Sequence, residues 1–251
     1  MRCGEAVFPT GAVNGGFLEV RVPWGPGSGE AEVGWVPAEG LGPAGVESRL
    51  HVCSAEALAF ASPTRRAGGP VERLPLGASL PRAAPADRGA DGFEPVTVRG
   101  RTLFVQAEDV AERPPSAPSA ADRLAVAMGM LGRPYVWGGC TSLGLDCSGL
   151  VKMLGGLCGV GLPHSAAGQA ALERGGFGAV AGVDAAEPGD AVYLRPPGGR
   201  VDHVVLWLGG GEVVHASAEG GRPAVRREPW SVVAKRGEVA AIRRLSPAAP
   251  A

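Results

Sequence analysis

Two neighbouring stretches decide the fold: YVWGGC at positions 135–140 and DCSGLV at positions 146–151. The first is a loop broken by two glycines, and the second places Cys147 directly before Ser148–Leu157, a stretch that can form a helix. At a helix N-terminus a thiol meets unpaired backbone N–H groups and the positive end of the helix dipole, which favour the thiolate. We therefore expect Cys147 to begin a helix, with a lowered thiol pKa and with backbone donors placed to hold an oxyanion.

Two histidines, His203 and His215, lie on a predicted β-hairpin whose strands are joined by three glycines. A loop centred on Gly209 places the two imidazoles directly opposite each other, and one centred on Gly210 makes them diagonal neighbours on one face. A two-residue turn would place them on opposite faces. On a shared face, His203 can accept the proton of Cys147 while His215 holds the other ring nitrogen and fixes the tautomer.

Two other interpretations of these residues stay open. The histidines can be satisfied core residues, and Cys147, His203 and His215 together have the composition of a zinc site. The sequence offers no close-spaced ligand pair such as HxxxH or CxxC, so neither a metal nor an organic cofactor is predicted. Spacing alone does not separate these interpretations from nucleophilic catalysis. The remaining thiols are expected to be structural residues without a nearby partner: Cys3, Cys53, Cys140 and Cys158.

The composition limits which binding partners and which cellular compartment are expected. The chain is 45% hydrophobic with a formal net charge of -1 and no run of like charges, which predicts a folded protein that binds neither nucleic acid nor an anionic membrane. No apolar leader follows the N-terminus, and no apolar run of about 18 residues occurs. Five cysteines without a CxxC pair fit reduced thiols in a cytoplasm. We therefore expect a cytoplasmic protein, or a secreted one if a leader has been removed. No oligomeric state is predicted.

The first 111 residues are β-rich, with short strand-like runs separated by turn residues. The phrase VTVRGRTLFV at positions 96–105 predicts a hairpin that turns at Arg99-Gly100. Two small β-barrels are expected, over residues 1–45 and 46–111. Both resemble bacterial SH3 domains, the first through GWVPAEGL at positions 34–41. One irregular β-domain without a binding role is the alternative.

A proline-rich stretch, ERPPSAPSAA at positions 112–121, has the composition of a semi-rigid linker. Ser119 stands three residues before Asp122, the pattern of a helix N-cap, and apolar residues follow at helical spacing. A second domain is therefore expected over residues 122–251.

In their order along the chain, the motifs of this second half resemble the NlpC/P60 family of papain-like cysteine peptidases, which cut peptidoglycan stem peptides. The resemblance covers roughly residues 122–245. It rests on YVWGG at 135–139, DCSGLV at 146–151, Leu162-Pro163 with Gln169 downstream, Pro188-Gly189-Asp190, HVVLWLG at 203–209 and His215-Ala216. The implied fold is α+β, a papain-like catalytic domain preceded by two small SH3-like β-barrels.

The resemblance also implies roles for individual residues. Cys147 is the implied nucleophile, His203 the general base and His215 the third polar residue. Positions that flank the nucleophile in such enzymes help to shape the substrate site, and here they are occupied by Tyr135, Asp146 and Ser148.

SH3-like modules ahead of such a domain resemble the subgroup that hydrolyses the bond between γ-D-glutamate and a diamino acid, usually meso-diaminopimelate. In that subgroup the first module borders the active site, so Trp35 is expected to contact substrate. The implied partners are free peptidoglycan-derived peptides rather than intact wall. The subgroup commonly carries Arg-Asp-Ser after Leu-Pro, with the acid placed to pair with the substrate's free amino group.

Here the chain instead has His164-Ser165-Ala166. Ser165 takes the acid's position and is expected near the substrate, but it carries no charge to pair with an ammonium. Either another acid supplies that charge or the free-amine requirement is relaxed. His164 is expected to lie near the site mouth without a catalytic role.

The sequence leaves two other classes of function as alternatives. A catalytically silent protein could bind wall peptides through its SH3-like modules, which the intact Cys147, His203 and His215 argue against. Acyltransferases of the same family have a permuted motif order, and the position of the cysteine before the histidines argues against that class.

Overall fold

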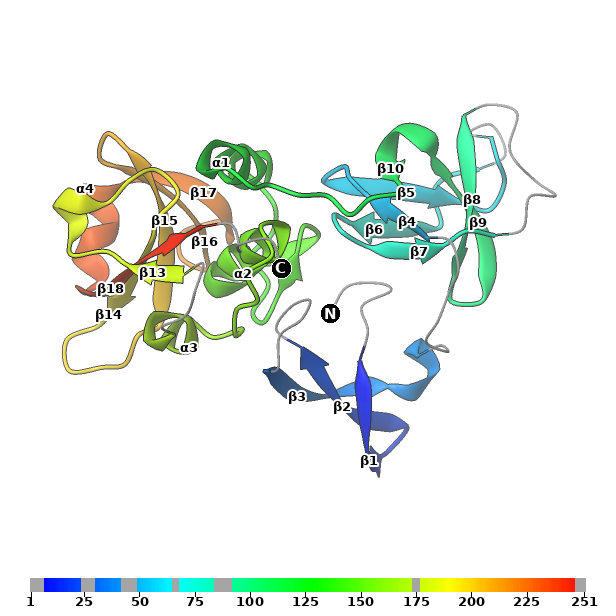
Figure 1. The fold of residues 1–251 in the computed structure, drawn as a ribbon, viewed down its shortest axis with the longest axis horizontal. Coiled ribbons are helices and arrows are strands. Elements are labelled where there is room, and N and C mark those ends of the chain that lie inside the picture. The colour runs from blue at the N-terminus through cyan, green and yellow to red at the C-terminus, as the bar shows by residue number, and fades with distance from the viewer. Residues whose placement is uncertain are drawn as a thin grey trace. The chain divides into compact units, whose positions relative to one another are not determined.

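The computed structural model describes residues 7–23, 30–41, 49–64, 68–83, 92–172 and 177–246. The chain forms two compact units, and the first unit ends at Pro115 (Figure 1). This boundary lies inside the stretch predicted as a linker. Cys3 and the expected division at residues 45 and 46 lie outside the described residues.

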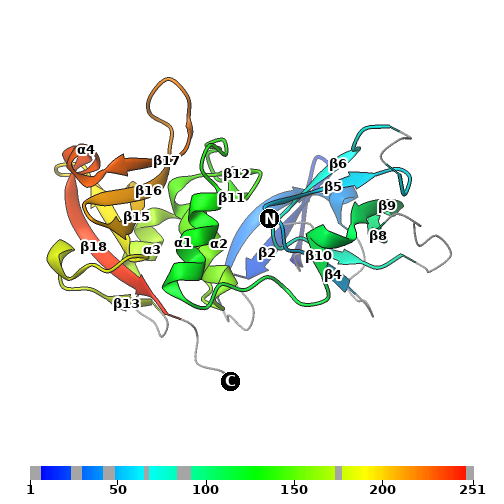
Figure 2. The same ribbon diagram turned by 90° about the horizontal axis from the view of Figure 1, so that it is seen from above.

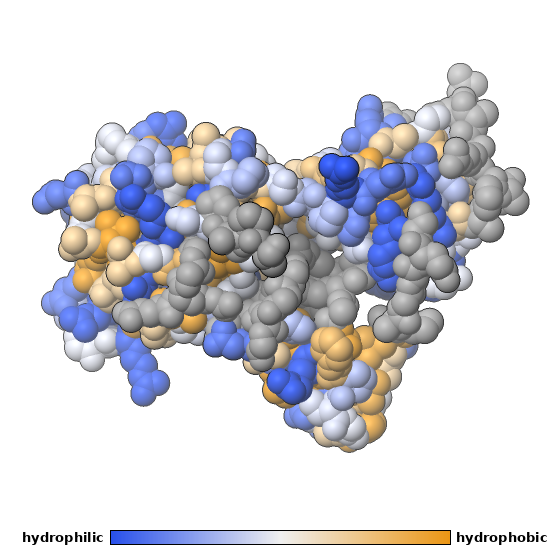
Figure 3. All heavy atoms as spheres, viewed as in Figure 1, coloured by the Kyte–Doolittle hydropathy of each residue, from blue (hydrophilic) through white to orange (hydrophobic). Residues whose placement is uncertain are grey.

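The first unit begins with a three-stranded antiparallel sheet in the order β1-β2-β3. Its strands are β1 (Phe8–Asn14), β2 (Phe17–Pro23) and β3 (Ala31–Pro37), and the 3-10 helix η1 (Ala38–Gly40) follows. Apolar side chains are exposed over this sheet, as Figure 3 shows. They are Phe8, Val13, Phe17, Val33 and Trp35.

The rest of the first unit contains two small sheets, in the orders β10-β4-β7 and β6-β5-β9-β8. Their elements are β4 (Arg49–Val52), β5 (Glu56–Phe60), β6 (Glu72–Pro75), β7 (Ser79–Pro81), β8 (Phe93–Val98), β9 (Arg101–Gln106), η4 (Ala107–Asp109) and β10 (Val110–Ala111). One aliphatic core joins the two sheets, with Leu50 and Leu80 from one and Val96 and Val105 from the other. The identity of these strand sets as SH3-like modules stays a prediction.

The predicted hairpin between β8 and β9 is confirmed. Val98 pairs with Arg101, and the two turn residues have φ values of 48° at Arg99 and 72° at Gly100. A two-residue turn of this kind needs positive φ at both positions, which glycine adopts without strain.

The second unit is built on a six-stranded antiparallel sheet in the order β13-β18-β14-β15-β16-β17. Its strands are β13 (Phe177–Ala179), β14 (Ala191–Arg195), β15 (His203–Gly209), β16 (Glu212–Ser217), β17 (Ala224–Pro229) and β18 (Glu238–Leu245). Its helices are α1 (Ala120–Gly129), α2 (Cys147–Leu157), α3 (Ala166–Ala171), α4 (Trp230–Val233), η5 (Val183–Ala185) and η6 (Ala234–Arg236). A short hairpin of β11 (Cys140–Thr141) and β12 (Gly144–Leu145) precedes α2.

Both faces of this sheet are covered. Helices α1, α2 and α3 lie on one side, as Figure 2 shows, and α2 contacts β15 and β16. On β14, Tyr193 points toward α3 and its hydroxyl donates to Gln169 Oε1 at 3.1 Å. The neighbouring Val192 and Leu194 point the other way and pack with Val233 of α4. Alternate residues of one strand therefore serve two cores, as the period of a strand requires. Among the helices of the described residues, none is long and apolar enough to cross a bilayer.

Helix α1 starts where the sequence predicts. The Ser119 hydroxyl accepts the Asp122 backbone N–H at 3.0 Å, and the Asp122 carboxylate accepts the Ser119 N–H at 3.1 Å. This reciprocal pair is a capping box, and it satisfies two backbone donors that the first helical turn leaves without partners.

The β15–β16 hairpin has the second of the two odd-loop registers. Leu206 pairs with Val214 and Trp207 with Val213, so the loop is centred on Gly210, with a bulge at Gly209. The three loop glycines all have positive φ, from 61° to 85°. This register places His203 and His215 on one face as diagonal neighbours.

Candidate active site

Asp146 organises the start of helix α2. As the N-cap residue, it accepts the Gly149 N–H at 2.6 Å and the Ser148 hydroxyl at 3.0 Å through Oδ1. Its other oxygen, Oδ2, accepts the Gly138 N–H at 2.9 Å, so the same carboxylate also holds the preceding loop. A Cβ at position 149 would overlap the carbonyl oxygen of Gly139, and glycine is therefore required there. The DCSG sequence is thus a tight cap that fixes the first helical residue.

Cys147 is that first residue, as predicted, and it is buried with 7% of its surface exposed. Its Sγ lies 3.9 Å from the carbonyl oxygen of Asp202 and also faces the backbone N–H of Val204. Burial, and after it the negative charge of the Asp146 carboxylate, raises the pKa of the thiol to about 11, against the lowering effect of nearby backbone N–H groups. The expected lowered pKa is therefore wrong, because burial and a neighbouring anion outweigh the helix N-terminus.

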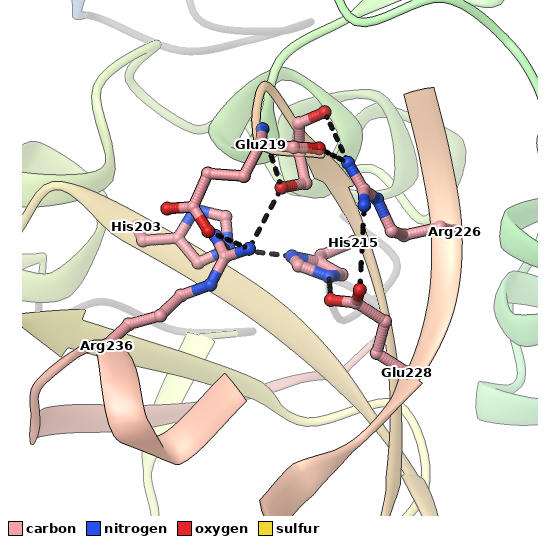
Figure 4. Close-up of polar contacts among 7 residues, drawn as sticks. His203, His215, Glu219, Arg226, Glu228 and Arg236 are labelled. Atoms are coloured by element: carbon pink, nitrogen blue, oxygen red, sulfur yellow. Dashed lines mark hydrogen bonds and ion pairs between the residues drawn. The ribbon is translucent and has the colours of Figure 1, made fainter. Parts of the chain in front are cut away.

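The half-buried His203 and the buried His215 form a pair with a carboxylate behind it (Figure 4). His203 Nε2 lies 2.7 Å from His215 Nδ1, with the ring planes at 78°. His215 is fully buried, and its Nε2 lies 2.8 Å from Oε2 of Glu228 on β17. Burial lowers the pKa of both histidines to about 3, so both rings are neutral near pH 7. His203, His215 and Glu228 thus form one row, which we call the histidine–glutamate row.

Two arginines adjoin this row, as Figure 4 shows. Arg236 Nη1 lies 3.4 Å from His203 Nε2, and the same guanidinium pairs with Glu219 at 2.9 Å. Arg226 Nη1 lies 3.6 Å from Oε1 of Glu228. Burial is the largest cause of the low histidine pKa values. The positive charge of Arg236 lowers the pKa of both histidines further, and that of Arg226 lowers the pKa of His215, because a nearby cation disfavours an imidazolium.

Sequence reasoning missed Glu228, Arg226 and Arg236. The available signal is the alternation in AVRREP at positions 224–229, which places residues 226 and 228 on one face of a strand. Which side chains of β16 lie beside residues 226 and 228 depends on the β16–β17 register, in which His215 pairs with Arg226. Strand periodicity alone does not supply that register.

The thiol lies against the start of β15, the strand that carries His203. The groups nearest the Cys147 sulfur on this strand belong to Asp202 and Val204, the residues on either side of His203. His215 engages Nε2 of His203, which leaves Nδ1 as the ring nitrogen for another partner. The structure therefore brings a buried thiol against the peptide of His203, whose imidazole is neutral.

The other expected site residues are placed as follows. Tyr135 is half-buried, and burial followed by the charges of Cys147 and Asp146 raises its pKa to about 12. The Ser148 hydroxyl is used by Asp146. Ser165 caps α3 by accepting the Gly168 N–H at 3.1 Å. Trp35 lies on β3 of the first unit. Contact of these residues with substrate stays a prediction.

Gln169, part of the Leu-Pro motif, has a structural role here. It is fully buried, and its side-chain amide donates to the carbonyl oxygens of Ser148 at 2.9 Å and Pro163 at 2.8 Å. Its own oxygen accepts the Tyr193 hydroxyl. The side chain therefore fastens α3 to the first turn of α2 and to the sheet.

Cys140 is not the partnerless thiol that the sequence suggested. Its side chain is hydrogen-bonded to His164, whose Nε2 lies 3.1 Å from Oδ2 of Asp146. The hydrogen bond with Asp146, and then that with Cys140, raises the pKa of His164 to about 9. His164 is therefore charged near pH 7, and its charge balances that of the buried Asp146 carboxylate. The two residues are 18 positions apart in the sequence.

The remaining described thiols make local contacts. The Cys158 thiol donates to the Gly155 carbonyl at 3.3 Å, and the exposed Cys53 thiol donates to the His51 carbonyl at 3.4 Å. Within the described ranges, no cluster of three or more His, Cys, Asp and Glu side chains is arranged to hold a metal ion. The facing nitrogens of His203 and His215 instead bond to each other.

A helix that begins at a buried thiol and packs on an antiparallel sheet carrying paired imidazoles is the architecture of a papain-like domain. Residues 132–234 match the model of the NlpC/P60 family. The second unit of this chain therefore carries an NlpC/P60 family domain, and the resemblance seen in its motifs is confirmed.

Two curated relatives match this part of the chain. The gamma-D-glutamyl-L-lysine dipeptidyl-peptidase of Bacillus subtilis is 30% identical over 130 residues, 51% of this chain and 42% of that protein. The peptidoglycan endopeptidase RipB of Mycobacterium tuberculosis is 33% identical over 110 residues, 38% of this chain and 42% of that protein. The chain thus spans less than half the length of these relatives.

The whole fold also has a solved counterpart. An NlpC/P60 family protein from Bacillus cereus matches with a TM-score of 0.76 and 22% identity, over 98% of this chain and 81% of the other. This likeness shows that the two chains share a fold.

The raised thiol pKa predicts how Cys147 reacts with an alkylating reagent. Only the thiolate reacts, and below the pKa its fraction rises tenfold per pH unit, so the iodoacetamide rate at Cys147 should rise about 100-fold from about pH 7 to pH 9. Peptide mass spectrometry after timed quenching measures this rate, with the exposed Cys53 as an internal reference. A rate at Cys147 that stays flat over this range would show a preformed thiolate–imidazolium pair instead.

Proposed function

We propose that this protein is a cysteine endopeptidase that hydrolyses the bond between γ-D-glutamate and a diamino acid in murein stem peptides. The observation that carries the proposal is the buried Cys147 thiol at the start of α2, set against the backbone of His203 beside the histidine–glutamate row. The names of the two curated relatives support the substrate class, since one acts on a γ-D-glutamyl-L-lysine bond and the other on peptidoglycan.

The reaction proceeds through an acyl-enzyme. Cys147 Sγ attacks the γ-carbonyl carbon of D-glutamate while its proton passes to Nδ1 of His203, which converts a neutral thiol and a neutral imidazole into the attacking pair. Backbone N–H groups at the start of α2, including that of Cys147, hold the oxyanion. The C–N bond then breaks, and the imidazolium gives its proton to the leaving amine.

Hydrolysis of the thioester completes the cycle. His203, neutral again, takes a proton from water, which attacks the thioester carbonyl, and the proton then returns to the departing Cys147 sulfur. The low pKa of His203 keeps its imidazole neutral near pH 7, which is the state that can accept the thiol proton.

A cavity beside the row supports diaminopimelate over lysine as the diamino acid. The cavity is about 370 Å³, and its lining includes Arg226, Lys235 and Arg236 together with Glu219 and Glu228. Both arginines pair with these glutamates, whereas Lys235 is exposed and makes no ion pair among the described residues. Diaminopimelate differs from lysine by one side-chain carboxylate, and a lysine ammonium in this cavity gives that carboxylate a partner.

Exchange of Lys235 tests this choice of substrate. We expect Lys235→Gln to lower kcat/KM about two- to five-fold for L-Ala-γ-D-Glu-meso-diaminopimelate, the size expected for one exposed ion pair, and to leave the lysine-containing tripeptide unaffected. Arg222→Gln removes another exposed charge of the same unit outside the cavity lining and serves as the control. Equal losses for both peptides would rule out a carboxylate partner at Lys235.

The activity itself is tested with the full chain and two peptides. L-Ala-γ-D-Glu-meso-diaminopimelate and its N-acylated form are incubated with the protein, and released diaminopimelate is measured by mass spectrometry. Release from the free peptide alone would establish an endopeptidase that recognises the terminal amine through an acid elsewhere in the chain, because position 165 is a serine. Equal release from both forms would mean a relaxed amine requirement, and no release from either would leave peptide binding without hydrolysis.

A further inference from the structure

We infer that Glu228 is a positioning residue: it sets the tautomers of His215 and His203 in sequence and so leaves Nδ1 of His203 as the nitrogen that can accept a proton. The hydrogen bonds that set these tautomers are a property of the structure. Its catalytic consequence rests on the proposed peptidase function.

The inference follows from which groups can donate a hydrogen bond. An ionised carboxylate only accepts, so the 2.8 Å contact with Glu228 requires a proton on Nε2 of His215. A neutral imidazole carries one N–H, so Nδ1 of His215 is then an acceptor. The 2.7 Å contact with His203 therefore requires a proton on Nε2 of His203, and its Nδ1 keeps the lone pair.

Arg236 favours the opposite arrangement. A guanidinium has no acceptor, so its 3.4 Å contact with Nε2 of His203 asks that nitrogen to accept. In that arrangement Nδ1 of His203 carries the proton, so this nitrogen could not accept the proton of a thiol. Nε2 of His215 would then face the Glu228 carboxylate with a lone pair instead of a proton. The contacts within the row are 0.6 to 0.7 Å shorter than the Arg236 contact, and one of them is charge-assisted. The tautomers set by Glu228 therefore prevail.

Glu228 is held so that it can do this. Its Oε1 faces Arg226 Nη1 at 3.6 Å while Oε2 meets His215, so the two oxygens have separate partners. The side chain is 22% exposed, and it reaches a histidine that is itself fully buried. Without Glu228, Nε2 of His215 would lose its acceptor, and either tautomer of the histidine pair could form.

Nuclear magnetic resonance of protein labelled with ¹⁵N-histidine tests the inference directly. Long-range ¹H–¹⁵N correlations show which ring nitrogen carries the proton. In the wild-type protein we expect both His203 and His215 as Nε2–H tautomers, and in Glu228→Ala a shift of His215 toward Nδ1–H. The doubly protonated His164, which is held by Asp146, reports in the same spectrum whether the variant is folded.

Glu219→Ala is the matched control, because Glu219 lines the same cavity and pairs with Arg236 but contacts neither histidine among the described contacts. Its spectrum should keep both wild-type tautomers. An Nδ1–H tautomer of His203 in the wild-type protein, or unchanged tautomers in a folded Glu228→Ala variant, would overturn the inference. Neither result depends on activity, so failure of the proposed function is distinguishable from failure of this inference.

Kinetics supply the second readout. If the tautomer matters for catalysis, Glu228→Ala should lower kcat about 10- to 100-fold with little change in KM, the size typical of a residue that orients a functional group. Glu228→Asp, which keeps the carboxylate, should recover part of the loss. A loss confined to KM would contradict a positioning role.

Discussion

Replacing Cys147 with Ala is expected to reduce hydrolysis of L-Ala-γ-D-Glu-meso-diaminopimelate by at least about 10⁴-fold, because it removes the sulfur on which the proposed acyl-enzyme forms. The substitution removes one sulfur from a buried position whose helix cap, Asp146, stays in place. The folded state should therefore persist, as thermal unfolding followed by circular dichroism will show. The rate is measured by mass spectrometry of the released diaminopimelate.

Cys53→Ala is the control for this experiment, since that thiol is exposed in the first unit and its hydrogen bonds among the described residues go to backbone carbonyls. It should retain the wild-type rate. Residual hydrolysis in Cys147→Ala within about tenfold of wild type would exclude Cys147 as the nucleophile, provided that the variant protein is folded.

Replacing His203 with Ala is expected to lower kcat by about 10² to 10⁴-fold, the range for loss of a general acid–base group. The reason is that a neutral thiol with a pKa of about 11 cannot attack unless a base accepts its proton. His51→Ala, in the first unit, is the control. A His203→Ala variant with the wild-type rate would mean that the thiol proton leaves by another route, and the assignment of the base would be wrong.

Local sequence was sufficient where short-range rules decide the structure. The capping box at Ser119 and Asp122, the turn at Arg99-Gly100 and the helix that begins at Cys147 each depend on a few adjacent residues. The face shared by the two histidines also follows from loop geometry. An odd loop of glycines allows two registers, and both keep the imidazoles on one side of the hairpin.

Long-range contacts explain what sequence missed. The pKa of Cys147 is governed by burial under the sheet and by Asp146, and a helix-dipole argument includes neither. Glu228 reaches His215 only through the β16–β17 register, which is set beyond the reach of strand periodicity. Cys140 likewise meets His164 through the folding of two segments separated by helix α2.

The central claim, that Cys147 forms an acyl-enzyme with the γ-D-glutamyl group, is tested most directly by intact-protein mass spectrometry. The protein is mixed with L-Ala-γ-D-Glu-meso-diaminopimelate and quenched in acid at short times. The account predicts a transient added mass equal to the L-Ala-γ-D-Glu acyl group, located on Cys147 by peptide mapping and absent from Cys147→Ala. Such an adduct on another residue, or turnover that persists in Cys147→Ala without any adduct, would contradict it.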